Sequence, residues 1–555
     1  MAVGTVAVAL LAMVVGGVVV GQQGLRLMRA AESLQASAAQ VRSSLSSFDI
    51  EAVAAELTAT RSAAQSVLEA MDSPTGRALL RLPATDREAR TLRQVAESVI
   101  VLADGSAPLL NVLAAQPSAL DQVIALVSAT AEVTTLAQAV STISVPAEGE
   151  APLRYGLAEP AAQLASALTA ARASVLALDE AVLPLQSALG MATPTRWLVM
   201  AQNPAESRGS GGLFNAYLIV EVREGRPRIV EAGSRKRLDG EFPRAEQIPY
   251  LNTVDIDTAH TWGPVLGEWA SMNMPADFPT VARLAAAGMA QRGSPVSGVI
   301  AIDPYLVATV LAGTGPVEHR GVTIDADSAA DYFMRGLYVD YPDIADVEAK
   351  DDLAMGLTYA TVDAALTRPL DVASLAARAP DAVAGGHLRA WAADPRVQRW
   401  LETTPMAGSL RSHPAEVVVA YNNATGSKLD AYATRTVTTD ARTCPTDGIV
   451  TTRVEVTNDA PTGLPAYVDL TLGQDGLPDP AAPPGQTLTY VTAYPPAGWR
   501  LRSATLSGGR VEPMSVMEAG RDAWLVPVSL PRGATTSVSF QWRAPSCPRT
   551  SDTAG

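Results

Sequence analysis

The sequence predicts a multidomain protein with an N-terminal transmembrane helix, an α-helical membrane-proximal region, an α/β core domain and a C-terminal all-β sandwich. Three observations lead to this prediction. The chain starts with a long uncharged run, the hydrophobic period changes from about 3.6 to about 2 near residue 191, and short alternating runs continue from residue 416. With 555 residues the chain is too long to fold around a single hydrophobic core. We place the segments at residues 1–21, 22–190, 191–410 and 414–548, with a disordered tail at 549–555.

The first segment is predicted to be an uncleaved membrane anchor. Residues 2–20 contain no charged side chain, and as a helix they would span roughly 28 Å, enough for a bilayer core. No small-residue cleavage pattern follows convincingly. Arg26 and Arg29 follow the span, which by the positive-inside rule favours a cytoplasmic C-terminal side.

The cysteines favour the opposite placement. Cys444 and Cys547 are the only two in the chain, and they bracket one predicted domain. Such a pair suits a disulfide formed in an oxidising compartment, with two buried free thiols as the alternative. The predicted anchor and the two cysteines together indicate a single-pass cell-membrane protein with the bulk of the chain outside the cytoplasm. A signalling protein that faces the cytoplasm is the other interpretation.

Composition restricts the partners. A net charge of −15 argues against general nucleic-acid binding, which needs a basic face. Lysine occurs only at Lys236, Lys350 and Lys428, so that arginine dominates. This usage is typical of high-GC, actinobacterial-like sequences. A local arginine cluster is still able to bind a phosphate on an acidic protein.

Periodicity predicts the elements in order. Residues 22–190 are rich in Ala and Leu at helical spacing, which indicates a helical bundle or stalk. Strands and helices then alternate, as expected of an α/β or α+β domain. We expect strands at 196–203, 216–225, 226–234 and 296–303, and helices at 280–293, 304–313, 326–338, 347–366 and 387–401. Seven alternating runs predict the sandwich; they are 415–423, 431–440, 449–459, 466–473, 486–496, 523–530 and 535–543.

Most catalytic signatures are absent: the chain has no G-x-S-x-G, Walker A, H-E-x-x-H or C-x-x-C motif. What remains is a polar and cationic set around the glycine-rich stretch "ESRGSGG" and the stretch "SRKRLDG". Glycines let backbone N–H groups approach a ligand, and arginines bind phosphate in a bidentate manner. The predicted ligand-binding residues are Gln202, Asn203, Glu206, Arg208, Gly211, Gly212, Arg235 and Arg237.

Carboxylates near this set are candidate Mg²⁺ ligands, because Mg²⁺ needs only one or two of them beside ligand oxygens. They are Asp239, Glu206 and Asp277. The alternative interpretation is purely structural: a tight glycine turn held by a Glu206–Arg208 network, with "SRKR" as a solvated edge.

These stretches also carry a family resemblance. "QNPAESRGSGGLFNAY", "GRPRIVEAGS", "MNMPADFPTVARL" and "VSGVIAIDPYLVATVLAGTGPVE" resemble, in this order, the domain of unknown function 4012 family over about residues 191–370. More distantly, the order is similar to the LytR-CpsA-Psr family, membrane-anchored enzymes that move glycans from polyprenyl-pyrophosphate carriers onto the cell wall. That resemblance implies Arg208, Arg237 and Asp239 as catalytic candidates.

Two functions follow as expectations. The first is a non-catalytic cell-envelope protein whose anion-binding α/β core binds a glycan, a polyprenyl-phosphate lipid carrier or a protein partner. The alternative is a Mg²⁺-dependent phosphotransferase that moves glycans onto the cell wall. A deep apolar tunnel ending at Arg208 and Arg237 would favour the enzyme, whereas a solid core there would favour the binding protein.

Overall fold

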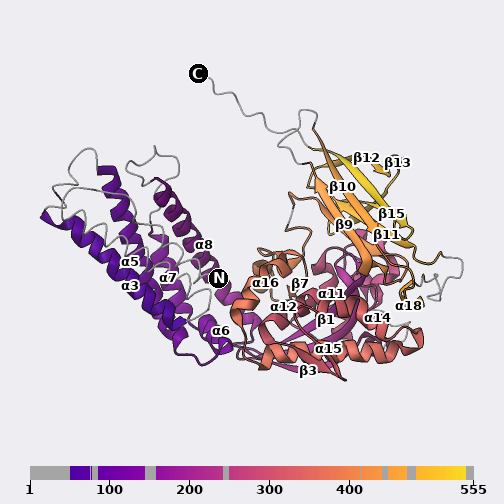
Figure 1. Cartoon of the computed structure of the whole chain (residues 1–555), viewed down its shortest axis with the longest axis horizontal. Coiled ribbons are helices and arrows are strands. Elements are labelled where there is room, and N and C mark those ends of the chain that lie inside the picture. Colours follow the sequence, from indigo (N-terminus) through magenta and orange to yellow (C-terminus); the bar gives the residue numbers. More distant parts are fainter. Residues whose placement is uncertain are drawn as a thin grey trace, which may run out of the picture. The chain divides into compact units, whose positions relative to one another are not determined.

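The computed structural model describes residues 50–74, 77, 86–143, 158–241, 249–412, 414–440, 448–469, 471 and 483–544. The predicted anchor at 1–21, Cys444, Cys547 and the tail at 549–555 lie outside these residues. The chain divides into two compact units, which we take separately (Figure 1). One comprises Met1–Ala192 with Pro369–Ala373, and the other comprises Thr193–Arg368 with Ser374–Gly555.

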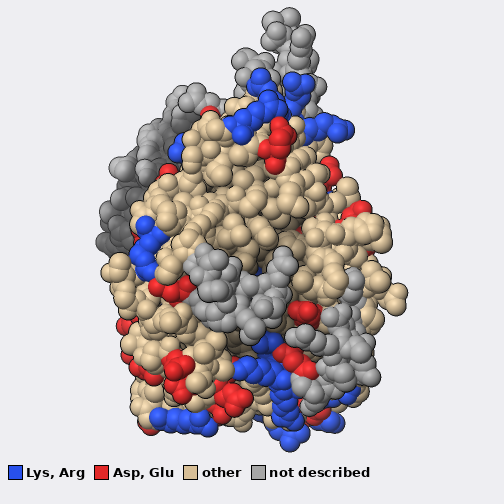
Figure 2. All heavy atoms as spheres, turned by 90° about the vertical axis from the view of Figure 1, so that its right-hand side faces the viewer, with Lys and Arg blue, Asp and Glu red and all other residues tan. Residues whose placement is uncertain are grey.

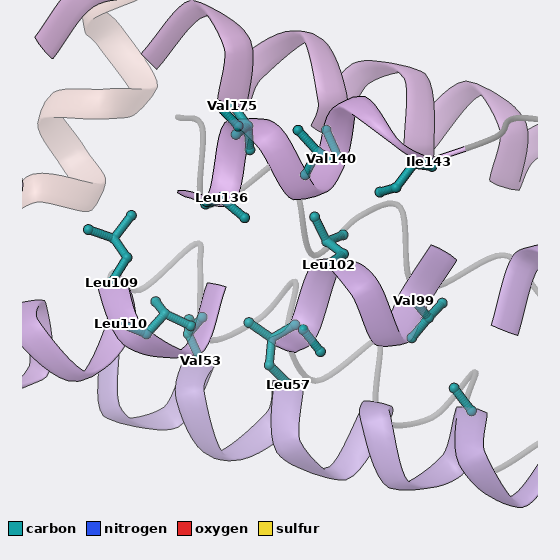
Figure 3. Close-up of a cluster of buried hydrophobic side chains, with 14 of the residues drawn as sticks. Val53, Leu57, Val99, Leu102, Leu109, Leu110, Leu136, Val140, Ile143 and Val175 are labelled. Carbon is teal, nitrogen blue, oxygen red and sulfur yellow. The ribbon is translucent and has the colours of Figure 1, made fainter. Parts of the chain in front are cut away.

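The first unit is a helical bundle. Its described helices are α3 (Ile50–Asp72), α5 (Asp86–Ala114), α6 (Ala119–Ser128), α7 (Thr130–Ser141) and α8 (Ala158–Ala188). In α3, Val53, Leu57 and Val67 lie on one helical face and are buried. They join Leu102 of α5 and Val175 of α8 in one apolar core, which Figure 3 shows in close-up.

One described helix is long and apolar enough to cross a bilayer. It is Arg93–Ala114 within α5, and half of its most apolar window is buried; α6 and α7 pass the same test only as a pair bent by 71°. A core helix of a soluble protein has the same length and composition. Val99 and Leu102 of this helix belong to the bundle core, so packing explains its apolar character.

The second unit starts with a mixed five-stranded sheet in the order β3-β2-β1-β4-β7. Its strands are β1 (Thr195–Arg208), β2 (Gly211–Arg223), β3 (Arg226–Ser234), β4 (Gly298–Ile302) and β7 (Leu388–Ala392). Only β1 and β4 are parallel; the other pairs are antiparallel. The carboxyl ends of β1 and β4 therefore reach the same edge of the sheet.

Helices cover this sheet, which confirms the mixed α/β architecture. Leu198 and Met200 of β1 pack with Val281 and Leu284 of α11 (Phe278–Gln291). A second apolar cluster joins α12 (Pro304–Thr314) to α15 (Val347–Thr367). Shorter elements connect these parts: α9 (Arg235–Glu241), α10 (Ile256–Trp262), β5 (Val317–His319), β6 (Val322–Ile324), α13 (Ala329–Asp331), a π-helical turn at Tyr332–Gly336, α14 (Leu337–Asp340), α16 (Val372–Ala384) and α17 (Pro395–Leu401).

Two antiparallel sheets form the C-terminal part. Their orders are β13-β12-β16-β10-β9 and β14-β15-β11-β8. The elements are β8 (Val418–Asn423), β9 (Ala433–Thr439), β10 (Ile449–Asn458), α18 (Ala466–Asp469), β11 (Thr487–Tyr494), β12 (Arg500–Leu506), β13 (Gly509–Val511), β14 (Met514–Glu518), β15 (Arg521–Leu530) and β16 (Thr535–Arg543). Val454 and Phe540 of one sheet share a core with Val491 and Val526 of the other, as in a sandwich.

Two element predictions were wrong. The predicted helix at 387–401 contains strand β7, which pairs with β4 before the short helix α17 begins. The predicted strand at 466–473 begins as the helical turn α18, where the N–H of Val468 donates to the carbonyl of Pro465 over 2.9 Å. In both places tertiary packing overrides the local pattern: Trp391 packs on the sheet core, and the Tyr467 ring lies 5.8 Å from that of Tyr338.

Candidate functional site

The glycine-rich stretch forms the tip of the β1–β2 hairpin. Arg208 pairs with Gly211, and Ser207 with Gly212, so β1 continues beyond the strand end expected at residue 203. Pro204–Glu206 bulge out between Asn203 and Ser207, since no residue of β2 opposes them. The Asn203 Oδ1 stabilises this bulge by accepting from the N–H of Ala205 over 2.9 Å.

The glycines are needed because the chain's own atoms lie against them. A Cβ at Gly212 would lie 2.2 Å from the carbonyl carbon of Asn203, and one at Gly209 would lie 2.1 Å from the carbonyl oxygen of Met274. Gly211 has φ +142°, and its Cβ would meet the Gln202 Oε1 at 2.0 Å. Protein atoms thus occupy the space that the sequence suggested for a ligand.

Glu206 and Arg208 form a buried ionic cluster with Lys428. The Glu206 Oε1 lies 2.5 Å from the Arg208 Nη2, and its Oε2 accepts from the Lys428 Nζ. All three residues are at most 9% exposed. Burial by itself would raise the pKa of Glu206, but Lys428 and Arg208 outweigh burial and lower the pKa to about 2. The carboxylate is therefore ionised and both of its oxygens are engaged.

A second buried carboxylate, Asp430, holds the rest of the hairpin tip. It accepts from the N–H of Ser207 over 2.9 Å and from the Arg435 Nη2 over 2.6 Å. The N–H of Gly209 donates to the Asn422 Oδ1 over 2.8 Å. Residues of the C-terminal part thus bind the groups that the sequence assigned to a ligand.

The remaining predicted site residues lie elsewhere. Arg235 pairs with Asp239 inside α9, and Arg237 is exposed on the same helix. Burial raises the pKa of Asp239, although Arg235 opposes that effect. Asp277 caps α11: its Oδ2 accepts from the N–H of Thr280 over 3.1 Å, and its Oδ1 takes a further backbone N–H at 3.0 Å. Within the described ranges, no three His, Cys, Asp or Glu residues gather where a metal ion would bind.

The three lysines of the chain lie in one connected network, which the sequence did not indicate. Lys236 and Lys350 contact the two oxygens of Asp351 at 3.1 and 3.0 Å. The Lys350 Nζ also donates to the Tyr467 hydroxyl over 3.3 Å, and the Lys428 Nζ lies 5.7 Å from the centre of the same ring. All other residues of the Lys and Arg class are arginine. The three lysines of the chain therefore share one environment.

This network borders a small pocket at the carboxyl edge of β1 and β4. Its volume is about 40 Å³. The polar lining residues are Gln202, Asn203, Asn215, Asp303, Tyr338, Lys350 and Asp351, and apolar side chains such as Ile302, Phe333 and Leu337 complete the wall. Gln202 and Asn203 were predicted to bind a ligand, whereas Arg208, Arg235 and Arg237 are not part of this lining.

Gln202, one of the lining residues, carries an unsatisfied donor. Its Nε2 is buried and has no hydrogen-bond partner within the described part of the chain, although the residue is only 5% exposed. A buried amide without a partner costs about 1–3 kcal/mol. Asn203 differs, since its Nδ2 donates to the carbonyl of Phe333 over 3.0 Å and to the Tyr338 hydroxyl over 3.2 Å.

Asp303 connects the pocket to a histidine. It caps α12 by accepting from the N–H of Tyr305 over 2.9 Å, and its Oδ2 lies 2.7 Å from the Nδ1 of His387. Sequence reasoning missed this pair because the two residues lie 84 positions apart. The available signal was "AIDP", an aspartate that follows a buried strand and precedes a helix-starting proline.

Residues 193–338 match the family model described as "Protein of unknown function (DUF4012)". This match confirms the resemblance to that family. No curated protein and no solved structure matches the chain, so the resemblance to the LytR-CpsA-Psr family stays a prediction.

The DUF4012 segment supplies only part of the site. It runs from β1 to α14 and includes the hairpin tip, Gln202, Asp303 and Tyr338. Lys350 and Lys428 follow it in the chain. Both the pocket wall and the partners of Glu206 are therefore completed by residues outside the DUF4012 segment.

Proposed function

We propose that the chain is a non-catalytic, membrane-anchored cell-envelope protein whose α/β core binds an oxyanion, the phosphate group of an envelope glycan or lipid carrier. The observation that carries this proposal is a pocket lined by Lys350 and by Gln202, a residue whose buried Nε2 has no hydrogen-bond partner within the described part of the chain. Amide and ammonium groups that line one pocket are donors of the kind that bind an oxyanion.

The cationic clusters next to the pocket, and not its lining, supply a positive surplus, because the lining itself has Lys350 against Asp303 and Asp351. Lys236 and Lys350 exceed Asp351 by one positive charge, and Lys428 and Arg208 exceed Glu206 by another. The other lining carboxylate, Asp303, has its oxygens engaged by α12 backbone N–H groups and by His387. The surplus of positive charge therefore lies on the lysine network that borders the pocket.

The pocket size supports a single head group. A volume of about 40 Å³ holds a few heavy atoms, because one water-sized probe takes roughly 10–15 Å³. A phosphate fits this space, whereas a prenyl chain or a whole sugar would have to lie outside it.

The phosphotransferase alternative lacks such support. It requires Arg208, Arg237 and Asp239 to converge on one pyrophosphate with Mg²⁺. Arg208 instead donates to Glu206 and to the carbonyl of Ser207, and Asp239 pairs with Arg235. The extracytoplasmic location rests on the uncharged run at 2–20 and on the two cysteines.

Calorimetric titration of the full-length chain in detergent micelles with pyrophosphate, with and without Mg²⁺, tests the proposal. We expect wild-type binding that weakens at least about tenfold in Lys350→Gln and in Gln202→Leu, since charge-assisted hydrogen bonds contribute roughly 1.5–3 kcal/mol. Arg399→Gln is the control, because Arg399 is exposed and outside the pocket lining.

The same preparation separates the two functions. Incubation with Mg²⁺ and a polyprenyl-pyrophosphate-linked glycan should release no polyprenyl phosphate. Release that disappears in Arg208→Gln would favour the transferase. A wild-type chain that binds no pyrophosphate at millimolar concentrations would contradict the oxyanion pocket.

A further inference from the structure

The β-sandwich carries a second, larger hollow, distant in sequence from the DUF4012 segment. Its volume is about 340 Å³, at the lower end of the roughly 300–1,000 Å³ of ligand sites. Three arginines line it, together with Ser503, Glu512, Asp522 and Trp524. The arginines are Arg500 and Arg502 of β12 and Arg510 of β13.

Most of this positive charge is uncompensated. Arg500 and Arg502, and also Arg543 of the neighbouring strand β16, have no carboxylate partner among the residues that the structure describes. Arg510 lies 3.5 Å from Glu512, but both side chains are more than 70% exposed, so this ion pair contributes little. In a protein with net charge −15, unpaired arginines on one strand pair are unexpected.

The pairing of β12 with β16 brings arginine side chains close together. Arg500 lies directly opposite Arg543, while the next pair, Leu501 and Trp542, packs into the sandwich core. Directly opposed residues share a face, so the two guanidinium groups lie on the same side of the sheet. Arg502 falls in the bulge between Leu501 and Ser503 and is exposed beside them. Like charges placed this way destabilise a sheet unless an anion neutralises them.

The other lining residues restrict the chemical class of the ligand. Asp522 and Glu512 would repel a bare polyanion, but their carboxylates can accept hydrogen bonds from sugar hydroxyls. Trp524 offers a flat apolar surface for the C–H face of a sugar ring, and its ring is held 5.5 Å from that of Trp542. Arginine binds a carboxylate or phosphate substituent in a bidentate manner.

We infer that this hollow binds an acidic sugar unit of an anionic glycan. The guanidinium groups of Arg500 and Arg502, which line the hollow, hold the anionic substituent, and the carboxylates and Trp524 hold the ring. Arg543, paired with Arg500 on the next strand, adds to the positive charge beside the hollow. Figure 2 shows basic side chains gathered near the top of one face of the molecule, and the arginines of β12, β13 and β16 form an exposed basic patch. The inference is independent of the oxyanion pocket in the α/β core.

Titration of the full-length chain in micelles with trigalacturonate and with the neutral maltotriose tests the inference. We expect trigalacturonate to bind, maltotriose to bind at least about tenfold more weakly, and trigalacturonate binding to weaken as salt is raised. The Arg500→Gln/Arg543→Gln double variant should lose at least about tenfold in trigalacturonate affinity.

Two controls keep the outcome interpretable. Arg453→Gln removes an arginine from the same sheet that already lies 3.8 Å from Glu455, and it should leave the affinity unchanged. Lys350→Gln should also leave it unchanged, which separates this site from the core pocket. The double variant should keep or gain thermal stability, because it removes a like-charge pair.

Three results would overturn the inference: no binding of trigalacturonate, equal binding of maltotriose, or equal loss in Arg453→Gln and in the double variant.

Discussion

Two fully buried glutamates show how partners decide the state of a carboxyl group. Glu206 has two cationic partners, and its pKa falls to about 2. Glu518 has no cationic partner among the residues that the structure describes: it accepts from the N–H of Asp277 and the Tyr494 hydroxyl, each over 2.7 Å, and from the Trp262 Nε1 over 3.2 Å. Burial therefore raises the pKa of Glu518 to about 7, although these hydrogen bonds lower it.

Glu518 should make stability depend on pH. Between pH 4.5 and about 7 the folded carboxyl holds a proton that the unfolded one has lost, so the free energy of unfolding falls as pH rises through this window. The expected loss is about 3 kcal/mol in total. Denaturant midpoints at about pH 5 and about pH 8 measure it, and Glu518→Gln should flatten the dependence.

The exposed Glu512→Gln is the matched control and should keep the wild-type dependence. A Glu518→Gln variant with an unchanged slope would place the titrating group elsewhere.

At the scale of elements, the β1–β2 hairpin joins the α/β core to the sandwich. Residues of distant segments bind the backbone of its tip: the N–H of Ser207 donates to Asp430, the N–H of Gly209 donates to Asn422, and the carbonyl of Gly212 accepts from the Asn273 Nδ2. The strands of this hairpin followed from alternation. The bulge and the long register beyond Asn203 did not, because they depend on partners from distant segments.

Gly209→Ala should destabilise the protein by more than about 2 kcal/mol, because its Cβ would meet backbone atoms that have no room to shift. Gly509→Ala is the control: the nearest atom to its Cβ would be the carbonyl oxygen of Leu506 at an ordinary 3.5 Å. Urea unfolding of both variants measures the difference. Equal midpoints would mean that the hairpin tip relaxes freely.

At the scale of the whole molecule, the two units have separate cores, and different spectroscopic signals report their unfolding. All eight tryptophans lie beyond residue 193, in the second unit: Trp197, Trp262, Trp269, Trp391, Trp400, Trp499, Trp524 and Trp542. Within that unit, Glu518 ties the sandwich to α10 and α11. The α/β core and the sandwich are therefore expected to unfold together.

Thermal unfolding should separate the units. Tryptophan fluorescence reports one transition of the second unit, whereas circular dichroism at 222 nm adds the helices of the first and should show an additional phase. Glu518→Ala should lower the fluorescence transition and leave that additional phase in place. Coincident transitions in the wild type, both displaced by Glu518→Ala, would mean that the units unfold as one.

The sequence by itself determined the classes of structure in this protein. Local periodicity suffices for Ala-rich helices, for the hydrophobic strands of the mixed sheet and for most sandwich strands, because burial of one face repeats every 3.6 or 2 residues. It also selected Gln202 and Asn203, polar residues late in a buried strand. The predicted Cys444–Cys547 disulfide and the anchor remain predictions, since they lie outside the described residues.

Only the tertiary structure decided which polar groups are free. Arg208 and Gln202 look equally available in the sequence, yet Glu206 binds the first in a buried cluster with Lys428, while the second lines a pocket together with Lys350 and Asp303. Hydrogen bonds and ion pairs act over a few ångströms, between segments that the chain separates by a hundred residues or more. The local sequence pattern does not predict such neighbours, so the residues of the site can be identified only from the folded structure.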